Sequence, residues 1–203
     1  MDVTFPGSVV RRQGKSAGDF LAGLFFATKG LMLLQVREIT GLDTPVIQNW
    51  VNRGWVQRPV EKRYSANHLA RIMLINFLRP VAKLEHIARI MSFINGDVDD
   101  RADDIIPEAK LYIYICNILD RVDFETVLTD AALAPVIEEE IGDYEEPFEG
   151  AREKLIAGIK LILLYYAAAV LKVRADNMLS SLGLGDDNEP DSMETVNAAL
   201  SEE

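Results

Sequence analysis

The stretch Val36–Ser65, VREITGLDTPVIQNWVNRGWVQRPVEKRYS, decides the predicted fold. It divides into a short helix that ends at Gly41, a second helix over 44–53 and a basic hairpin over 55–64. This order is the layout of a winged helix-turn-helix, in which the second helix lies in the major groove of DNA.

Signals for both ends of the second helix are present. Asp43 or Thr44 can cap its N-terminus, and Pro45 suits the first helical position. Gly54 suits the residue just past the C-terminus, where a left-handed backbone is common. We therefore expect a helix of about three turns between these residues.

The second helix has an apolar face and a polar face. The apolar side chains are Val46, Ile47, Trp50 and Val51. Their spacing places them on one stripe, which is expected to face the core. The opposite face carries Pro45, Gln48, Asn49, Asn52 and Arg53. Amides pair with adenine edges in a major groove, and Arg pairs with guanine or phosphate. The predicted base-reading residues are Thr44, Gln48, Asn49 and Asn52.

The hairpin over 55–64 is expected to form a two-stranded wing, with its turn near Pro59. Arg and Lys side chains on phosphates fix the register of a protein on DNA but read no sequence. The predicted contacts to the DNA backbone are Arg53, Arg58, Lys62, Arg63, Tyr64, His68 and Arg71. The alternative is an ordinary charged hairpin without a DNA role.

These residues resemble the DNA-reading part of MerR-like regulators. The turn glycine, the aromatic residue and the helix-ending glycine of that pattern match Gly41, Trp50 and Gly54. Arg63–Ser65 resembles the end of the wing, where Arg and Tyr approach the phosphate backbone. This chain departs from the MerR pattern at Gln48 and Asn49, where those regulators usually have Arg and Tyr.

A closer resemblance is to a bacterial family named domain of unknown function eighteen-thirty-six. That family has an amide-rich second helix, a wing with the pattern P…K-[KR]-Y-S…H and a following LxxIxxI helix. The matching residues are Pro59, Lys62, Arg63, Tyr64, Ser65, His68, Leu84, Ile87 and Ile90. The likeness covers Phe20 to Asn95. Together the two resemblances imply a bacterial DNA-binding protein.

Charge divides the chain near Asn95. The formal net charge is −11, but residues 1–95 hold 13 Lys and Arg against 6 acids, a net charge of +7. Residues 96–203 hold 8 Lys and Arg against 26 acids, a net charge of −18. This asymmetry favours a basic half that meets polyanions, although acidic helices can also serve solubility alone.

Four segments follow from these patterns, and the fold class is expected to be mainly α. They are a flexible arm over 1–18, a winged helix-turn-helix domain over 19–95, an acidic helical domain over 96–182 and a disordered acidic tail over 183–203. Beyond the second helix, helices are expected over Phe20–Lys29 with Asp19 as cap, Ala66–Leu78 with Ser65 as cap, Lys83–Asn95, Pro107–Arg121, Asp123–Leu133 and Phe148–Leu182.

The last of these helices is unusually apolar, since Lys160 is the only charge between Leu155 and Leu171. This run approaches the lower length limit of a membrane span. The internal lysine and the absence of aromatic and basic flanks favour a buried helix instead. We therefore expect no membrane contact and a homodimer formed by the acidic half.

The sequence offers little for catalysis. It has no phosphate-binding glycine loop, no HExxH and no nucleophile elbow, so the chain is not expected to be an enzyme. His86 has no ligand partner nearby, and 96–104 lacks the glycine and glutamate of a calcium loop, so neither metal nor cofactor is expected. Cys116 is expected in the core, and a single cysteine without a visible signal peptide suits the cytoplasm.

Three functions are compatible with these observations. The first is a dimeric transcriptional regulator that binds double-stranded DNA at a near-palindromic operator. The second is a helix-turn-helix scaffold used as a protein-interaction adaptor, without DNA binding. The third adds to the first a small apolar effector bound by the helical half.

Overall fold

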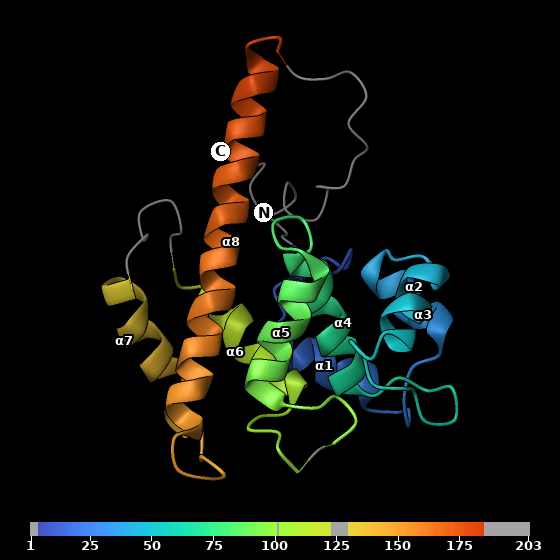
Figure 1. Cartoon of the computed structure of the whole chain (residues 1–203). Helices are drawn as coiled ribbons and strands as arrows, with labels where there is room; N and C mark the ends of the chain where they lie inside the picture. Colours follow the sequence, from blue (N-terminus) through green and yellow to red (C-terminus); the bar gives the residue numbers. More distant parts are fainter. Residues whose placement is uncertain (1–3, 101, 123–129, 185–203) are drawn as a thin grey trace.

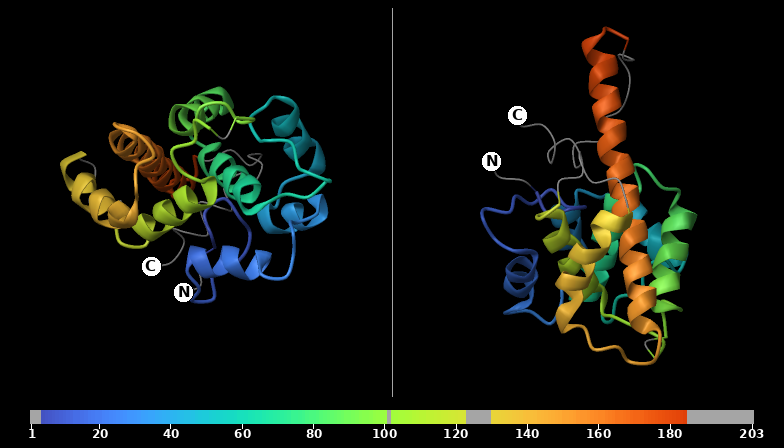
Figure 2. Two further views of the ribbon diagram at one scale, coloured as in Figure 1. Left: turned by 90° about the horizontal axis from the view of Figure 1, so that it is seen from below. Right: turned by 90° about the vertical axis from the view of Figure 1, so that its left-hand side faces the viewer.

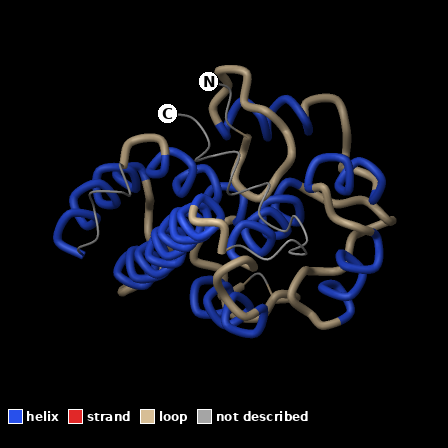
Figure 3. Tube along the Cα trace, turned by 90° about the horizontal axis from the view of Figure 1, so that it is seen from above, coloured by secondary structure: helices blue, strands red, loops and turns tan. Residues whose placement is uncertain are grey.

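The computed structural model describes residues 4–100, 102–122 and 130–184. Within these residues the chain forms α-helices joined by loops and has no strand, so the mainly α prediction is confirmed (Figures 1 and 3). The elements are α1 (Ala17–Phe25), α2 (Leu33–Thr40), α3 (Thr44–Asn52), α4 (Ala66–Leu78), α5 (Leu84–Asn95), α6 (Glu108–Leu119), α7 (Asp130–Glu140), the 3-10 helix η1 (Ile141–Asp143) and α8 (Ala151–Ser181).

Helix α4 lies at the centre of the molecule and contacts α2, α5, α6 and α8 (Figure 1). The eleven consecutive residues from His68 to Leu78 are all buried. A helix that is covered on every side must satisfy its polar side chains internally. The Asn76 amide nitrogen does so by donating to the carbonyl oxygens of Gly7 and Thr40, at 3.0 and 3.1 Å. Its Oδ1 is buried without a hydrogen-bond partner among the described residues.

The expected flexible arm over 1–18 is wrong for its described residues. Phe5 is buried and stacks on Phe20, with ring centroids 4.1 Å apart. The Tyr112 hydroxyl donates to the carbonyl of Pro6 at 2.8 Å. The segment lacks periodicity because one aromatic anchor and backbone hydrogen bonds hold it, and such contacts leave no pattern in the sequence. Helix α1 also starts earlier than expected, because Ser16 caps it in place of Asp19.

The two predicted domains share one hydrophobic core. Helix α4 packs on α6, and α5 packs on α8, so both halves contribute to the same cluster of buried side chains. The loop after α5 is tied down by Asn95, whose amide donates to Ile106 O at 2.7 Å and accepts from the Ile105 and Ile106 amides. The boundary predicted at residue 96 is therefore a loop and does not divide the core.

Most helix ends agree with the capping signals. The helix over 66–78 begins directly after Ser65, whose hydroxyl accepts from the His68 amide. Helices α5 and α6 follow Lys83 and Pro107 as N-cap residues. The helix predicted over Asp123–Leu133 overlaps α7. Its predicted start lies outside the described residues, and α7 continues past Leu133 to Glu140. Most of the tail predicted to be disordered also lies outside them.

Helix α8 is the longest element, with 31 residues, and its C-terminal part projects beyond the body of the protein (Figures 1 and 2). Its last buried residue is Val173. By length and composition, α8 could cross a membrane. The core helix of a soluble protein can have the same length and composition. Its inner face packs against α5 and α7.

We predict that Gly7→Ala destabilises the protein far more than Gly14→Ala. Both glycines have a left-handed backbone, with φ of +72° and +73°. A Cβ on Gly7 would lie 1.9 Å from the Met73 carbonyl oxygen, whereas a Cβ on Gly14 would have no neighbour within 4 Å. We expect Gly14→Ala to cost about 1 kcal/mol of backbone strain and Gly7→Ala at least about 3 kcal/mol in urea unfolding. Equal losses would contradict the packing of this arm on α4.

Candidate nucleic-acid interface

Helices α2 and α3 occupy the positions of the two helices predicted for the helix-turn-helix. Helix α2 stops at Gly41, which has φ +69° and donates its N–H to the Arg37 carbonyl at 2.8 Å. After a short turn, α3 starts at Thr44 with Asp43 as the N-cap residue and Pro45 in its first turn. The Asp43 carboxylate makes no capping hydrogen bond and instead lies 3.8 Å from the Arg37 guanidinium. The predicted extent of the second helix is confirmed.

The two faces of α3 are arranged as predicted. Ile47 and Trp50 are fully buried, and Val46 and Val51 pack against the same core. On the opposite side, the amides of Gln48, Asn49 and Asn52 are exposed, and Thr44 is partly exposed. The core contact thus orients the helix so that its amide face points away from the body.

The two-stranded wing is not formed. The segment 55–64 contains one isolated antiparallel bridge, between Val60 and Arg63, around a turn in which Glu61 and Lys62 have φ of +50° and +61°. Two positive φ values in succession are typical of a tight hairpin turn. No ladder extends from it, because Pro59 lacks an N–H and Tyr64 pairs with Leu31 instead, at 2.8 and 2.9 Å. We call residues 58–63 the basic turn.

The basic turn and α3 enclose a surface hollow of about 550 Å³. It is lined by Met32, Leu33, Gln48, Val51, Asn52, Pro59, Lys62 and Tyr64. Two predicted base-reading residues, Gln48 and Asn52, and two predicted backbone contacts, Lys62 and Tyr64, therefore line one concave surface. Met32 and Leu33, at the start of α2, also line this hollow. No motif in the sequence predicted their contribution.

Three of the residues predicted to contact the DNA backbone are instead buried in the protein. Tyr64, His68 and Arg71 are 4%, 6% and 3% exposed. Burial raises the pKa of the Tyr64 hydroxyl. The His68 ring is bound to Ser65, with Nδ1 and Oγ 2.6 Å apart. The sequence places polar residues near a helix start, which suggests exposure, but this helix is the centre of the core.

Arg71 has a structural role that the sequence did not indicate. Its Nε donates to the Trp55 carbonyl at 2.6 Å, and its Nη1 lies 3.1 Å from the Glu108 carboxylate. The side chains of Arg71 and Glu108 are 4% and 2% exposed. This buried pair connects the residues after α3 with the first turn of α6.

The remaining predicted backbone contacts are exposed. Arg58, Lys62 and Arg63 all lie at the surface of the basic turn. Arg53 is also exposed, although its guanidinium lies 3.8 Å from the Glu85 carboxylate and 5.0 Å from the centre of the Trp55 ring. Exposed pairs of this kind contribute little stability, so Arg53 is free to exchange partners at low energetic cost.

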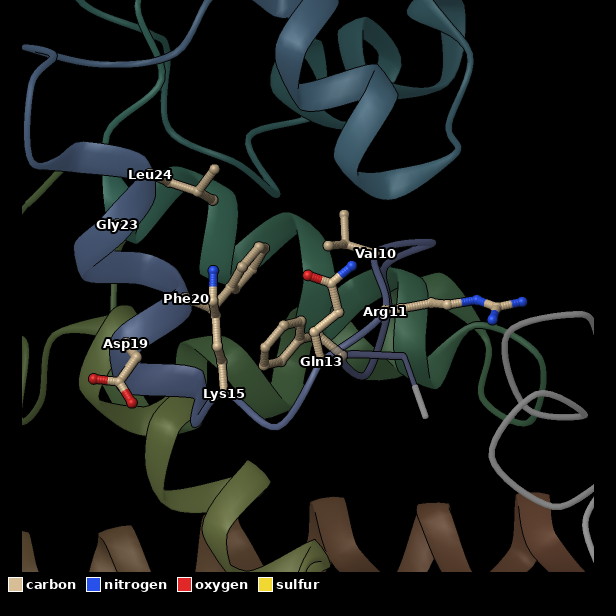
Figure 4. A pocket seen from close by; sticks show the side chains of 9 residues that line it. Val10, Arg11, Gln13, Lys15, Asp19, Phe20, Gly23 and Leu24 are labelled. Atoms are coloured by element: carbon tan, nitrogen blue, oxygen red, sulfur yellow. The ribbon is translucent and has the colours of Figure 1, made fainter. Parts of the chain in front are cut away.

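The described residues also contain a buried cysteine and a second hollow. They contain no cluster of His, Cys, Asp and Glu side chains that could hold a metal ion. Cys116 is buried as predicted, and burial raises the pKa of its thiol to about 12. A second hollow of about 520 Å³ lies beside the N-terminal segment, where Arg11, Gln13, Lys15 and Asp19 surround an aromatic floor (Figure 4).

Comparison with known proteins shows that part of this region matches a family model. Residues 26–115 match the family model described as "Domain of unknown function (DUF1836)". This match supports the resemblance to that family over residues 26–115. The matched segment runs from the end of α1 into α6, so it contains α3, the basic turn and both members of the Arg71–Glu108 pair.

A bacterial protein is also similar in sequence to this chain. The uncharacterized protein YkrK of Bacillus subtilis (strain 168) is 24% identical over 140 residues. The alignment covers 66% of this chain and 60% of YkrK, so the chain spans less than two thirds of that relative. No solved structure matches the chain.

We predict that Arg71→Met destabilises the fold by about 3–5 kcal/mol, because it leaves the Glu108 carboxylate buried without its partner. The double variant Arg71→Met, Glu108→Met is expected to recover part of this loss, since no charge remains buried. Arg53→Met removes the exposed pair with Glu85 and is expected to cost less than about 1 kcal/mol. Urea unfolding measures all three. A double variant no more stable than Arg71→Met would contradict the charge argument.

Proposed function

We propose that the chain is a DNA-binding transcriptional regulator of MerR-like type. In this proposal α3 enters the major groove of double-stranded DNA, and the basic turn lies on the phosphate backbone. The observation that carries the proposal is the shared hollow, in which Gln48 and Asn52 of α3 meet Lys62 of the basic turn.

The chemistry of α3 supports base readout. A surface helix normally presents Glu and Lys to water, whereas α3 presents Gln48, Asn49 and Asn52. An amide offers a donor and an acceptor side by side, which match the N7 and N6 groups of adenine. Because Ile47 and Trp50 are fixed in the core, the amides would meet the bases from a rigid helix.

The basic turn supports backbone contact. Arg58, Lys62 and Arg63 are exposed within one tight turn beside α3. Residues 1–95 carry a net charge of +7, and the acidic excess lies in the remainder of the chain. A local positive surface beside a helix that reads bases is the electrostatic arrangement expected of a DNA-binding domain.

The first prediction of this proposal concerns salt. Each contact between a basic side chain and a phosphate releases counterions and makes the slope of log affinity against log salt steeper by about 0.9. We expect the wild type to bind a labelled random duplex at low salt, and Lys62→Glu, Arg63→Glu to bind weakly with a slope shallower by about 2. Fluorescence anisotropy measures both. The charge-matched control is Lys110→Glu, Lys154→Glu on α6 and α8, outside α3, the basic turn and the exposed apolar stretch of α8, which should retain the wild-type slope. Absence of wild-type binding at low salt would overturn the proposal.

The second prediction concerns sequence preference. Once a preferred duplex has been selected from a random pool, Gln48→Ala and Asn52→Ala should each weaken binding to it by about tenfold to a hundredfold. Binding to a random duplex should change by less than about twofold, because amide–base contacts add nothing to the non-specific electrostatic affinity. Asn177→Ala removes an exposed amide of α8 and serves as the control. Equal losses on both duplexes would assign these amides to backbone contact.

A protein-interaction adaptor is the second candidate. Met32, Leu34 and Val60 are exposed apolar side chains of α2 and the basic turn, with 44%, 60% and 73% of their surfaces accessible. Apolar side chains at a surface favour contact with another protein. In that case the duplex would not bind at any salt concentration, and Val60→Asp would disrupt partner binding while Lys62→Glu would have little effect.

A further inference from the structure

The outer face of α8 carries a continuous apolar seam. Its members are Ala157, Leu161, Leu164, Ala168, Leu171, Ala175, Met178 and Leu182. Successive members are separated by four and three residues in strict alternation, which is the heptad spacing of a coiled coil. All eight side chains are exposed, and the five larger ones have between 39% and 65% of their surface accessible.

The seam is distinct from the face by which α8 joins the body. The inner face consists of residues such as Leu155, Ile159, Ile162 and Val170, which belong to the main hydrophobic core of the protein. A helix that served only its own chain would need one apolar face. The second face extends over more than three heptads, a length at which heptad spacing indicates a coiled coil.

We propose that the seam binds the same seam of a second copy of this chain, with the two α8 helices antiparallel. The arrangement pairs side chains of complementary size around a two-fold axis between Ala168 and Leu171. Along the seam the layers are Ala157 with Leu182, Leu161 with Met178, Leu164 with Ala175 and Ala168 with Leu171 of the second copy. A parallel arrangement in register would instead stack alanine on alanine in three layers and leave them underfilled.

The projecting end of α8 supports the antiparallel orientation. The C-terminal part of α8 projects beyond the other described helices (Figure 2). Val173 is its last buried residue, and Met178, Leu179 and Leu182 beyond it are apolar and exposed. In an antiparallel pair, this end lies against residues 157–165 of the second copy, at the level of its body. Each body then occupies the opposite end of the helix pair, and each projecting end is covered.

A second copy accounts for the seam better than a lipid bilayer does. A membrane span exposes apolar side chains to lipid, but the inner face of α8 is packed into the core of the protein, against α4, α5 and α7. Lys160, Lys172 and Arg174 flank the seam and remain at its margins. Flanking positions of a coiled coil are commonly charged.

Sedimentation equilibrium tests the seam with the full chain. We expect a soluble wild-type dimer, and we expect Leu171→Glu to raise the dimer dissociation constant at least about a hundredfold because its carboxylates would be buried near the two-fold axis. Leu34→Glu makes the same chemical change on exposed α2 and should leave the dimer intact. Circular dichroism checks that each variant is folded. A monomeric wild type, a dimer that Leu171→Glu does not weaken, or a chain recovered only with detergent would overturn the proposal.

Disulfide formation tests the orientation independently of stability. Residues 161 and 178 are 17 positions apart, about 25 Å along a helix, so an antiparallel pair cannot join Leu161→Cys to itself. We expect a cross-linked dimer only when Leu161→Cys and Met178→Cys proteins are mixed. Cys116 is buried and its pKa is raised to about 12, so it should not compete. Cross-linking of each variant alone would indicate parallel helices and overturn the antiparallel assignment. Because neither experiment contains DNA, failure here is separable from failure of DNA binding.

Discussion

The ion pair between Arg71 and Glu108 is the interaction on which the arrangement of the molecule depends. Arg71 lies on the central helix α4, and its guanidinium contacts both the Trp55 carbonyl and the Glu108 carboxylate. One side chain therefore connects the segment after α3, the core helix and the first helix of the acidic half. Burying two charges is costly unless each is paired and hydrogen-bonded, so this geometry leaves little freedom in how the three elements are placed.

The same constraint separates the surface from the core in the candidate interface. The residues after α3 are held inward by the hydrogen bond from Arg71 to the Trp55 carbonyl. Helix α3 itself is held by the buried side chains of Ile47 and Trp50. What remains outside is the amide face of α3 and the cations of the basic turn. A rigid scaffold that presents a few polar side chains is how folds commonly carry binding function. The match to DUF1836 over residues 26–115 spans this whole arrangement, including Glu108.

Helix α8 carries a different balance of surfaces. Its inner face completes the core to which α2, α3 and α4 contribute, and its outer face repeats exposed apolar residues at heptad spacing. A regulator with one recognition helix per chain needs a second copy to read a two-fold symmetric site. The proposed helix pair would supply that copy from the side of the molecule away from α3 (Figure 1).

The sequence by itself determined the helices and the face that each presents. Local rules were sufficient for Gly41, for the Ser65 cap and for the stripe of Ile47 and Trp50, because capping and periodicity act within a few residues. The tertiary structure decided which polar residues are accessible. His68 and Arg71 look exposed in sequence, but they become buried because helices distant in the chain close over α4. It also decided that Tyr64 pairs with Leu31, which replaced the wing by a turn, and that two apparent domains share one core. Contacts between distant residues depend on the packing of the whole chain, and no local pattern records them.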